Sequence, residues 1–142
     1  MMILVTTGCK KEEKPVNYTE LLPGEWHCAA VELGADVYVS FEKDGDFDLY
    51  QMLGEGRYRH YTGNWSIEGD ILSGTYSDGT AWGSSYKMSF SSKDSMTLTA
   101  QNGSDEVVTY SRTSIPSEVK DDCIDVKSSF GMLNSQPQYR WL

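Results

Sequence analysis

Short turn signals divide this sequence into segments of strand length. Seven clusters rich in Gly, Asp, Asn and Ser recur between residues 34 and 104, at 34–36, 43–45, 54–56, 68–70, 77–79, 92–95 and 102–104. Connections this short can join only antiparallel neighbours, because a parallel crossover needs a dozen or more residues. The sequence therefore favours a meander of hairpin-connected strands.

Apolar and polar side chains alternate along the segments between these turns. Val37, Val39 and Phe41, for example, share one face of their segment. Period-two alternation is typical of antiparallel strands that cover one core. It predicts strands at 26–33, 37–42, 46–53, 57–67, 71–77, 81–91, 96–101 and 106–113. Eight twisted strands can close on themselves and remove their edges, so we expect an all-β, eight-stranded antiparallel up-and-down barrel.

Composition and charge agree with a small acidic β domain. The chain has 142 residues, including 9 Tyr, 4 Trp and 4 Phe, which favours one domain built of strands. It carries 12 Lys and Arg against 21 Asp and Glu, for a net charge of -9. Duplex nucleic acid and anionic membrane surfaces both need a basic face, so we expect neither as the main partner. No run of 18 apolar residues predicts a membrane-spanning helix.

The first nine residues resemble a localisation signal. The run from Met1 to Gly8 is short and apolar, ends in small residues and precedes Cys9. It resembles the lipobox of bacterial lipoproteins, which implies that residues 1–8 are a signal remnant and that Cys9 is acylated. The alternative is an ordinary N-terminus with a free or buried cysteine.

A charged segment follows Cys9. Residues 9–20 are predicted to form a solvated tether, and Lys10-Lys11-Glu12-Glu13 lies within it. Lys-Glu-Glu after such a cysteine also resembles the export signal of Bacteroidetes-type surface lipoproteins. This implies a location on the outer face of the outer membrane. The only membrane contact would then be the lipid on Cys9, at about 0.8 kcal/mol per buried CH₂.

Two motifs connect the first and last predicted strands. Gly24-Glu25-Trp26 opens the first strand and Tyr110-Ser111-Arg112 ends the last. This arrangement resembles the lipocalin pattern, in which the Trp seals one end of the barrel and the Arg stacks over it. With the run from Gly63 to Tyr76, it resembles the lipocalin-like domains of Bacteroidetes-type lipoproteins over roughly residues 20–117. The resemblance implies a fold and a cellular location, but no substrate and no catalytic residues.

The predicted barrel spans residues 21–117 and is followed by a tail, residues 118–142. Because the tail ends in the apolar run Tyr139-Arg140-Trp141-Leu142, we expect it to dock back on the domain. Five aromatic residues are candidates to line a ligand site inside the barrel. An eight-stranded barrel is just wide enough for side chains or one small ligand, so the same residues could instead fill it. They are Tyr61, Trp65, Tyr76, Trp82 and Tyr86.

The remaining cysteines and charged motifs leave few other sites. Cys28 and Cys123 could form one disulfide in an oxidising compartment or stay as two free thiols. The segment 44–48 has calcium-loop residues but lacks the required Gly, so a β-turn is favoured. His27 and His60 show no spacing to further zinc ligands. We therefore expect no metal site, no cofactor and no catalytic residue.

These observations favour binding without catalysis. The first hypothesis is a surface lipoprotein that holds a small amphiphilic or sugar-like ligand at the barrel mouth. The alternative is an envelope interaction module with a side-chain-filled barrel, which contacts a partner protein or a glycan through its outer face.

Overall fold

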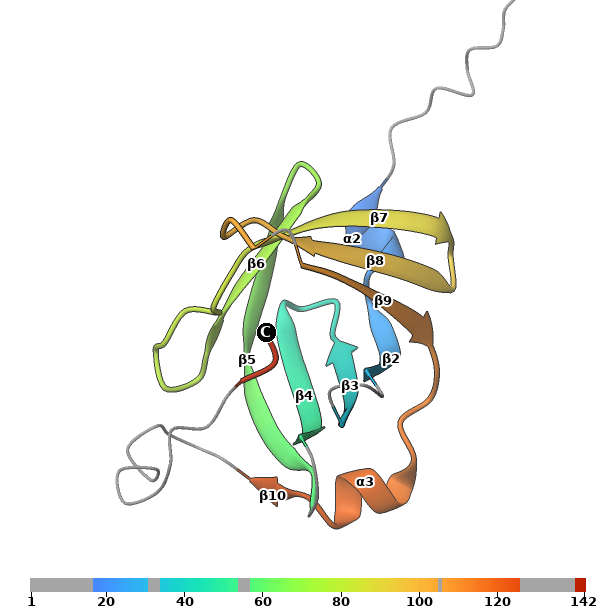
Figure 1. The fold of residues 1–142 in the computed structure, drawn as a ribbon, viewed down its shortest axis with the longest axis vertical. Helices are drawn as coiled ribbons and strands as arrows, with labels where there is room; N and C mark the ends of the chain where they lie inside the picture. The colour runs from blue at the N-terminus through green and yellow to red at the C-terminus, as the bar shows by residue number, and fades with distance from the viewer. Residues whose placement is uncertain (1–16, 31–33, 54–56, 105, 126–139) are drawn as a thin grey trace, which may run out of the picture.

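The computed structural model describes residues 17–30, 34–53, 57–104, 106–125 and 140–142. Cys9, the signal remnant and most of the tether lie outside the described residues. The described strands run antiparallel in chain order and close into a barrel, which confirms the predicted all-β, up-and-down fold (Figure 1). They are β2 (Gly24–Ala30), β3 (Ala35–Phe41), β4 (Asp46–Leu53), β5 (Arg59–Glu68), β6 (Ile71–Tyr76), β7 (Tyr86–Ser92), β8 (Ser95–Ala100) and β9 (Val107–Arg112).

Two pairings close the barrel. At one seam β2 pairs with β9, with Trp26 opposite Arg112. At the other, β5 pairs with β4 through its first half and with β6 through its second half. The first half of β5 therefore keeps one edge that β6 does not cover. The short strand β10 (Ile124–Asp125) pairs with this edge in parallel, beside Arg59 and His60.

One predicted strand begins later than its alternation suggested. The segment predicted at 81–91 becomes β7 only from Tyr86 onward. Before that point, Trp82 folds back and donates its backbone N–H to the Gly74 carbonyl at 2.9 Å. A Cβ at position 74 would lie 2.5 Å from the Trp82 ring, so the missing side chain of Gly74 makes room for the indole. The aromatic residue at 82 therefore belongs to a loop that packs on β6.

The inward side chains form one core. Alternation along β3 and β4 buries Val37, Val39 and Leu49, as the sequence predicted. The same cluster includes aromatic side chains from β2, β5, β6 and β9 and, at the end of the sequence, Leu142. Gln51 is the most buried polar side chain of the described core. The barrel interior is thus packed for most of its length.

One end of the barrel is closed by Trp26, Arg112 and the helix α2 (Tyr18–Leu21). The Arg112 guanidinium lies 4.2 Å from the Trp26 ring centroid and donates to the carbonyls of Leu21, Pro23 and Lys93. Gly24 has φ +135°, and a Cβ there would lie 2.2 Å from Arg112 Nη1. A side chain at position 24 would therefore displace the guanidinium from the ring. Because α2 begins at Tyr18, the end of the predicted tether is part of this closed end.

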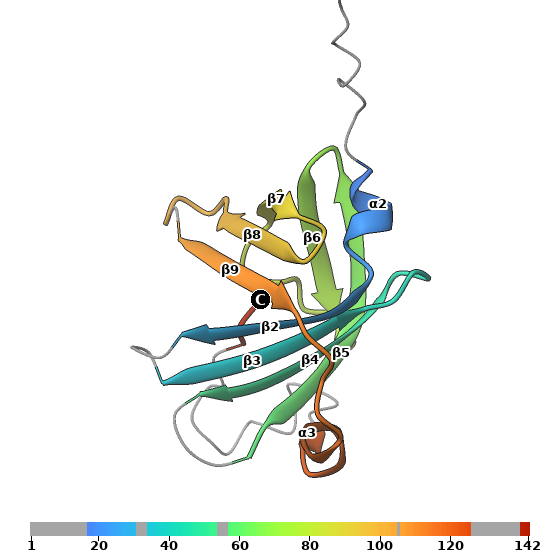
Figure 2. The same cartoon turned by 90° about the vertical axis from the view of Figure 1, so that its right-hand side faces the viewer.

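A smaller apolar cluster lies on the outer face of the sheet. The helix α3 (Ser117–Asp121) packs Val119 against Ile115 and Tyr50, whose neighbour in sequence, Leu49, points inward. Figures 1 and 2 show α2 and α3 at opposite ends of the molecule. Within the described residues, no helix is long and apolar enough to cross a membrane.

The disulfide between Cys28 and Cys123, which the sequence left open, does not form, and both thiols are free. The sheet separates them. Cys28 shares the inward face with Trp26, whereas Cys123 packs against the outer cluster. Burial, and then the nearby Asp36 carboxylate, raise the pKa of the Cys28 thiol to about 11, so it stays protonated and unreactive at neutral pH.

Candidate functional site

A cavity of about 140 Å³ opens at the end of the barrel opposite to α2. Arg112 is hydrogen-bonded next to the start of β8, at Lys93, whereas the cavity lies beyond the other end of this strand, at Ala100 and Asn102. Its inner wall is apolar and is formed by Leu98, Val108 and Tyr110. This end therefore presents a hollow that reaches the barrel interior.

The rim of the cavity is polar, and two aromatic residues line its walls in addition to Tyr110. Ser84, Asn102 and Glu106 contribute the polar groups, while Tyr86 and Trp141 contribute the rings. Asn102 and Glu106 are exposed, so the rim is open to solvent. Such a site can bury an apolar or ring-shaped group and hydrogen-bond the hydroxyls attached to it.

The last residues of the sequence lie inside the barrel (Figure 1). Leu142 is buried in the main core, and its carbonyl oxygen accepts a hydrogen bond of 2.8 Å from the Tyr76 hydroxyl. Trp141 donates its backbone N–H to Gln51 at 2.7 Å and its indole N–H to the Tyr110 hydroxyl at 2.8 Å. Of the tail expected to dock on the domain, residues 140–142 thus enter the barrel and form one wall of the cavity.

Arg140 fixes this segment at its entry into the barrel. Its guanidinium lies 3.1 Å from Asp78 Oδ2 and 4.2 Å from the centroid of the Tyr76 ring. The side chains of Arg140 and Asp78 are only 17% and 7% exposed, so solvent screens this ion pair little. Burial alone would raise the pKa of Asp78, but hydrogen bonds from Thr80 and the Arg140 charge outweigh it and lower this pKa to about 2.

Asp78→Asn is expected to lower the free energy of unfolding at pH 7 by about 1–3 kcal/mol, since it weakens a shielded, charge-assisted hydrogen bond. The pKa of Asp78 is lower in the folded state than in the unfolded one. Its ionised form therefore stabilises the fold fully above about pH 4, and this stabilisation is lost as the pH falls toward about 2. Urea unfolding across this window should show a shallower acid loss for Asp78→Asn than for the unmodified chain.

Asp122→Asn is the matched control. The Asp122 carboxylate is 77% exposed and lies 3.6 Å from Arg57. Exposed pairs of this kind contribute little to stability. Equal acid profiles for Asp78→Asn and the unmodified chain would show that the Arg140 ion pair does not hold the segment.

The predicted ligand-lining residues divide into three groups. Tyr61, Tyr76 and Trp82 are buried in the main core. Trp65 lies over the turn between β3 and β4, where its indole N–H donates to the carbonyls of residues 42 and 46. Tyr86 alone among the five lines the described cavity. Alternation gives the face of a strand but not the depth along the barrel axis, so it could not separate these groups.

The segment with calcium-loop residues is a hairpin turn between β3 and β4. Asp46 donates its N–H to Asp44 Oδ1 at 3.0 Å, and Gly45 has φ +100°.

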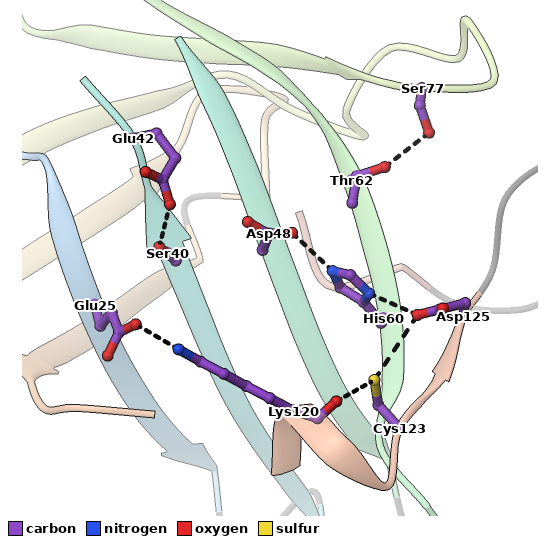
Figure 3. A network of polar contacts seen from close by, with 10 residues as sticks. All are labelled: Glu25, Ser40, Glu42, Asp48, His60, Thr62, Ser77, Lys120, Cys123 and Asp125. Atoms are coloured by element: carbon purple, nitrogen blue, oxygen red, sulfur yellow. Dashed lines mark hydrogen bonds and ion pairs between the residues drawn. The ribbon is translucent and has the colours of Figure 1, made fainter. Parts of the chain in front are cut away.

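A polar network around His60 lies on the outer face of the barrel (Figure 3). His60 Nε2 lies 2.8 Å from Asp48 and Nδ1 lies 2.7 Å from Asp125. Burial lowers the pKa of His60, but the two carboxylates outweigh it, so this pKa is raised.

The comparisons with known proteins agree with this architecture. A sequence profile described as a lipocalin-like domain matches residues 11–98, which is more than half of the chain. The chain belongs to the lipocalin-like domain family. The match covers the described chain from α2 through Leu98 of β8.

A solved structure resembles this lipocalin-like chain. It is the NMR structure of a protein from Bacteroides uniformis ATCC 8492, with a TM-score of 0.55 and 12% sequence identity, covering 74% of this chain and 99% of that chain. At this identity the likeness extends to the fold alone. No curated protein matches the chain significantly. Lipocalin-like barrels are generally binding proteins without catalytic activity, so family membership indicates a binding function.

Proposed function

We propose that this lipocalin-like protein binds a small amphiphilic or sugar-like molecule at the open end of its barrel and catalyses no reaction. The observation that carries the proposal is the cavity of about 140 Å³, which combines an apolar inner wall, three aromatic side chains and a polar rim. Leu98 and Val108 would contact the apolar part of the ligand, and Ser84 and Asn102 its hydroxyl groups.

The size of the cavity limits the ligand. One water molecule in the liquid occupies about 30 Å³, so the hollow takes a single ring or a short alkyl group rather than a whole lipid. The remainder of a larger ligand would extend past the exposed side chains of Asn102 and Glu106. A sugar ring stacked on Tyr86 or Trp141 is compatible with both the space and the polar rim.

The proposed location is the outer face of the outer membrane, with an acylated Cys9 as the anchor. The lipobox-like run before Cys9 and the Lys-Glu-Glu after it support this location. The described chain begins at Asn17, next to α2 at the closed end of the barrel. A tether on this side would leave the cavity facing away from the membrane.

Membrane fractionation tests the proposed location and the lipid anchor. The unmodified chain, expressed in a Bacteroidetes host, should sediment with membranes and carry acyl chains on Cys9 by mass spectrometry. Cys9→Ala should move the protein into the soluble fraction. An unmodified Cys9, or membrane association that survives Cys9→Ala, would contradict a lipid anchor.

Native mass spectrometry tests the binding function. The chain carrying Cys9→Ala, purified from its exported form without detergent, should retain a ligand of mass on the order of a few hundred daltons that is released on denaturation. Val108→Phe fills the cavity and should weaken rebinding of the released molecule at least tenfold. Val107, the neighbouring residue, is 58% exposed, so Val107→Phe should bind normally.

A native mass equal to that of the protein alone, together with no binding to sugars or short amphiphiles, would contradict this proposal. It would favour the second candidate function, an envelope interaction module that contacts a protein or glycan through its outer face. The insertion of Trp141 and Leu142 supports this candidate, because the chain itself fills most of the barrel. Equal rebinding by Val108→Phe and Val107→Phe would place the ligand outside the cavity.

A further inference from the structure

Three kinds of metal ligand meet on the outer face of the barrel, where β10 pairs with β5. The ligand atoms of His60, Cys123 and Asp125 all lie within 4.8 Å of one another. Figure 3 shows the imidazole, the thiol and the carboxylate directed toward a common point. We propose that these three residues bind a zinc ion, with a water molecule or an external ligand in the fourth position.

The distances fit a small zinc site. Zinc binds nitrogen and oxygen at about 2.0–2.2 Å and sulfur at about 2.3 Å, so ligand atoms around a tetrahedral ion lie about 3.3–3.6 Å apart. His60 Nδ1 lies 2.7 Å from Asp125 Oδ1, and Cys123 Sγ lies 3.8 Å from the same oxygen. His60 Nδ1 and Cys123 Sγ lie within 4.8 Å of each other. Zinc would replace these hydrogen bonds after side-chain movements on the order of one ångström, which rotation of the Cys123 and Asp125 side chains can supply.

The imidazole is already held as a metal ligand requires. Its Nε2 lies 2.8 Å from Asp48 Oδ1, and the ring stacks on Tyr50 at 4.4 Å with an interplanar angle of 4°. When Nε2 carries the proton and donates it to Asp48, the lone pair of Nδ1 points toward Cys123 and Asp125. A carboxylate behind a ligating histidine orients the ring and fixes its tautomer in many metal sites.

The backbone fixes the other two ligands relative to His60. Asp125 lies directly beside His60 in the parallel pairing of β10 with β5. Ile124 donates its N–H to the Tyr58 carbonyl at 2.8 Å, which anchors the two-residue strand. Cys123 immediately precedes this strand. Two of the three ligands therefore belong to paired strands, and Cys123 directly adjoins one of them.

The donor set selects the metal. Thiolate and imidazole favour zinc over magnesium or calcium, which prefer all-oxygen sites. His60 between two carboxylates could be a hydrogen-bonded network without a metal, but that arrangement does not need a thiol at the same point. The zinc ion would link the segment after the barrel to β5 and so hold β10 on its edge.

Cobalt titration of the full chain tests the site. After chelator treatment under reducing conditions, one equivalent of Co²⁺ should produce a sulfur-to-cobalt charge-transfer band and the strong visible bands of a four-coordinate site, and Zn²⁺ should displace it. Cys123→Ser should abolish the charge-transfer band. The same band should persist in Cys28→Ala and Cys9→Ser, which remove the other two thiols.

The supporting carboxylate gives a graded test. Asp48→Asn should weaken zinc affinity by about 10–100-fold, since it removes the group that orients His60. Zn²⁺ should raise the melting temperature of the unmodified chain but not that of Cys123→Ser, whose metal-free melting temperature should be unchanged.

A charge-transfer band that survives Cys123→Ser, or no saturable cobalt binding, would overturn the proposal. Zinc binding without a thiolate signature would do the same, because it would exclude Cys123 as a ligand. This inference does not depend on the ligand at the barrel mouth. Val108→Phe should therefore leave zinc binding unchanged.

Discussion

Trp26→Ala is expected to lower the free energy of unfolding by about 3–5 kcal/mol, the usual cost of deleting a fully buried Trp or Phe side chain. The Trp26 side chain is completely buried, and its indole N–H donates to the Leu22 carbonyl at 2.9 Å. The substitution also removes the ring on which Arg112 stacks, and with it a contact across the seam between β2 and β9. Urea unfolding followed by circular dichroism measures the loss.

Arg112→Lys tests the hydrogen bonds of Arg112 separately from its positive charge. A lysine keeps a positive charge near the Trp26 ring but cannot donate to the carbonyls of Leu21, Pro23 and Lys93 at once. We expect a loss of about 1–3 kcal/mol. If the free energy of unfolding of Trp26→Ala lies within about 1 kcal/mol of that of the unmodified chain, the closed end does not hold the first and last strands together.

Leu142→Ala is expected to cost about 2–5 kcal/mol, although it changes a residue at the end of the sequence. Leu142 is 3% exposed inside the main core, so its truncation leaves a hollow among buried side chains. The shortened side chain should also increase binding of a hydrophobic dye, since it enlarges the apolar hollow beside Leu98. Denaturant titration and dye fluorescence measure the two effects.

Val107→Ala is the control for Leu142→Ala. Val107 is 58% exposed on β9, so its truncation should change stability by no more than about 0.5 kcal/mol. Equal effects of the two substitutions would show that the end of the sequence does not occupy the barrel in solution. The interior would then be open to a larger ligand than the cavity of about 140 Å³ accepts.

Local sequence pattern accounts for much of the fold. Two or three residues of turn chemistry specify a hairpin, and alternation of Val37 and Val39 with polar neighbours specifies the face of a strand. The same reasoning places Trp26 and Cys28 together on the inward face, where both are buried. It did not find that Trp82 lies in a loop, because an aromatic residue before an alternating segment looks like the start of a strand.

The candidate sites depended on contacts between distant segments. His60 and Asp125 are 65 positions apart, and a two-residue strand such as β10 has no sequence signature of its own. The free edge of β5 that accepts β10 exists only because β5 is shared between β4 and β6. No local spacing could therefore bring Cys123 to the histidine.

The sequence by itself determined the fold class, the strand faces and the family, because hairpins and period-two alternation depend on residues that are near one another in the chain. Only the tertiary structure decided that Trp141 and Leu142 enter the barrel, that Tyr86 lines the remaining cavity, and that Cys28 and Cys123 lie on opposite faces. The physical reason is that these outcomes follow from the space left after eight strands have closed. That space is a property of the whole barrel and of no single segment.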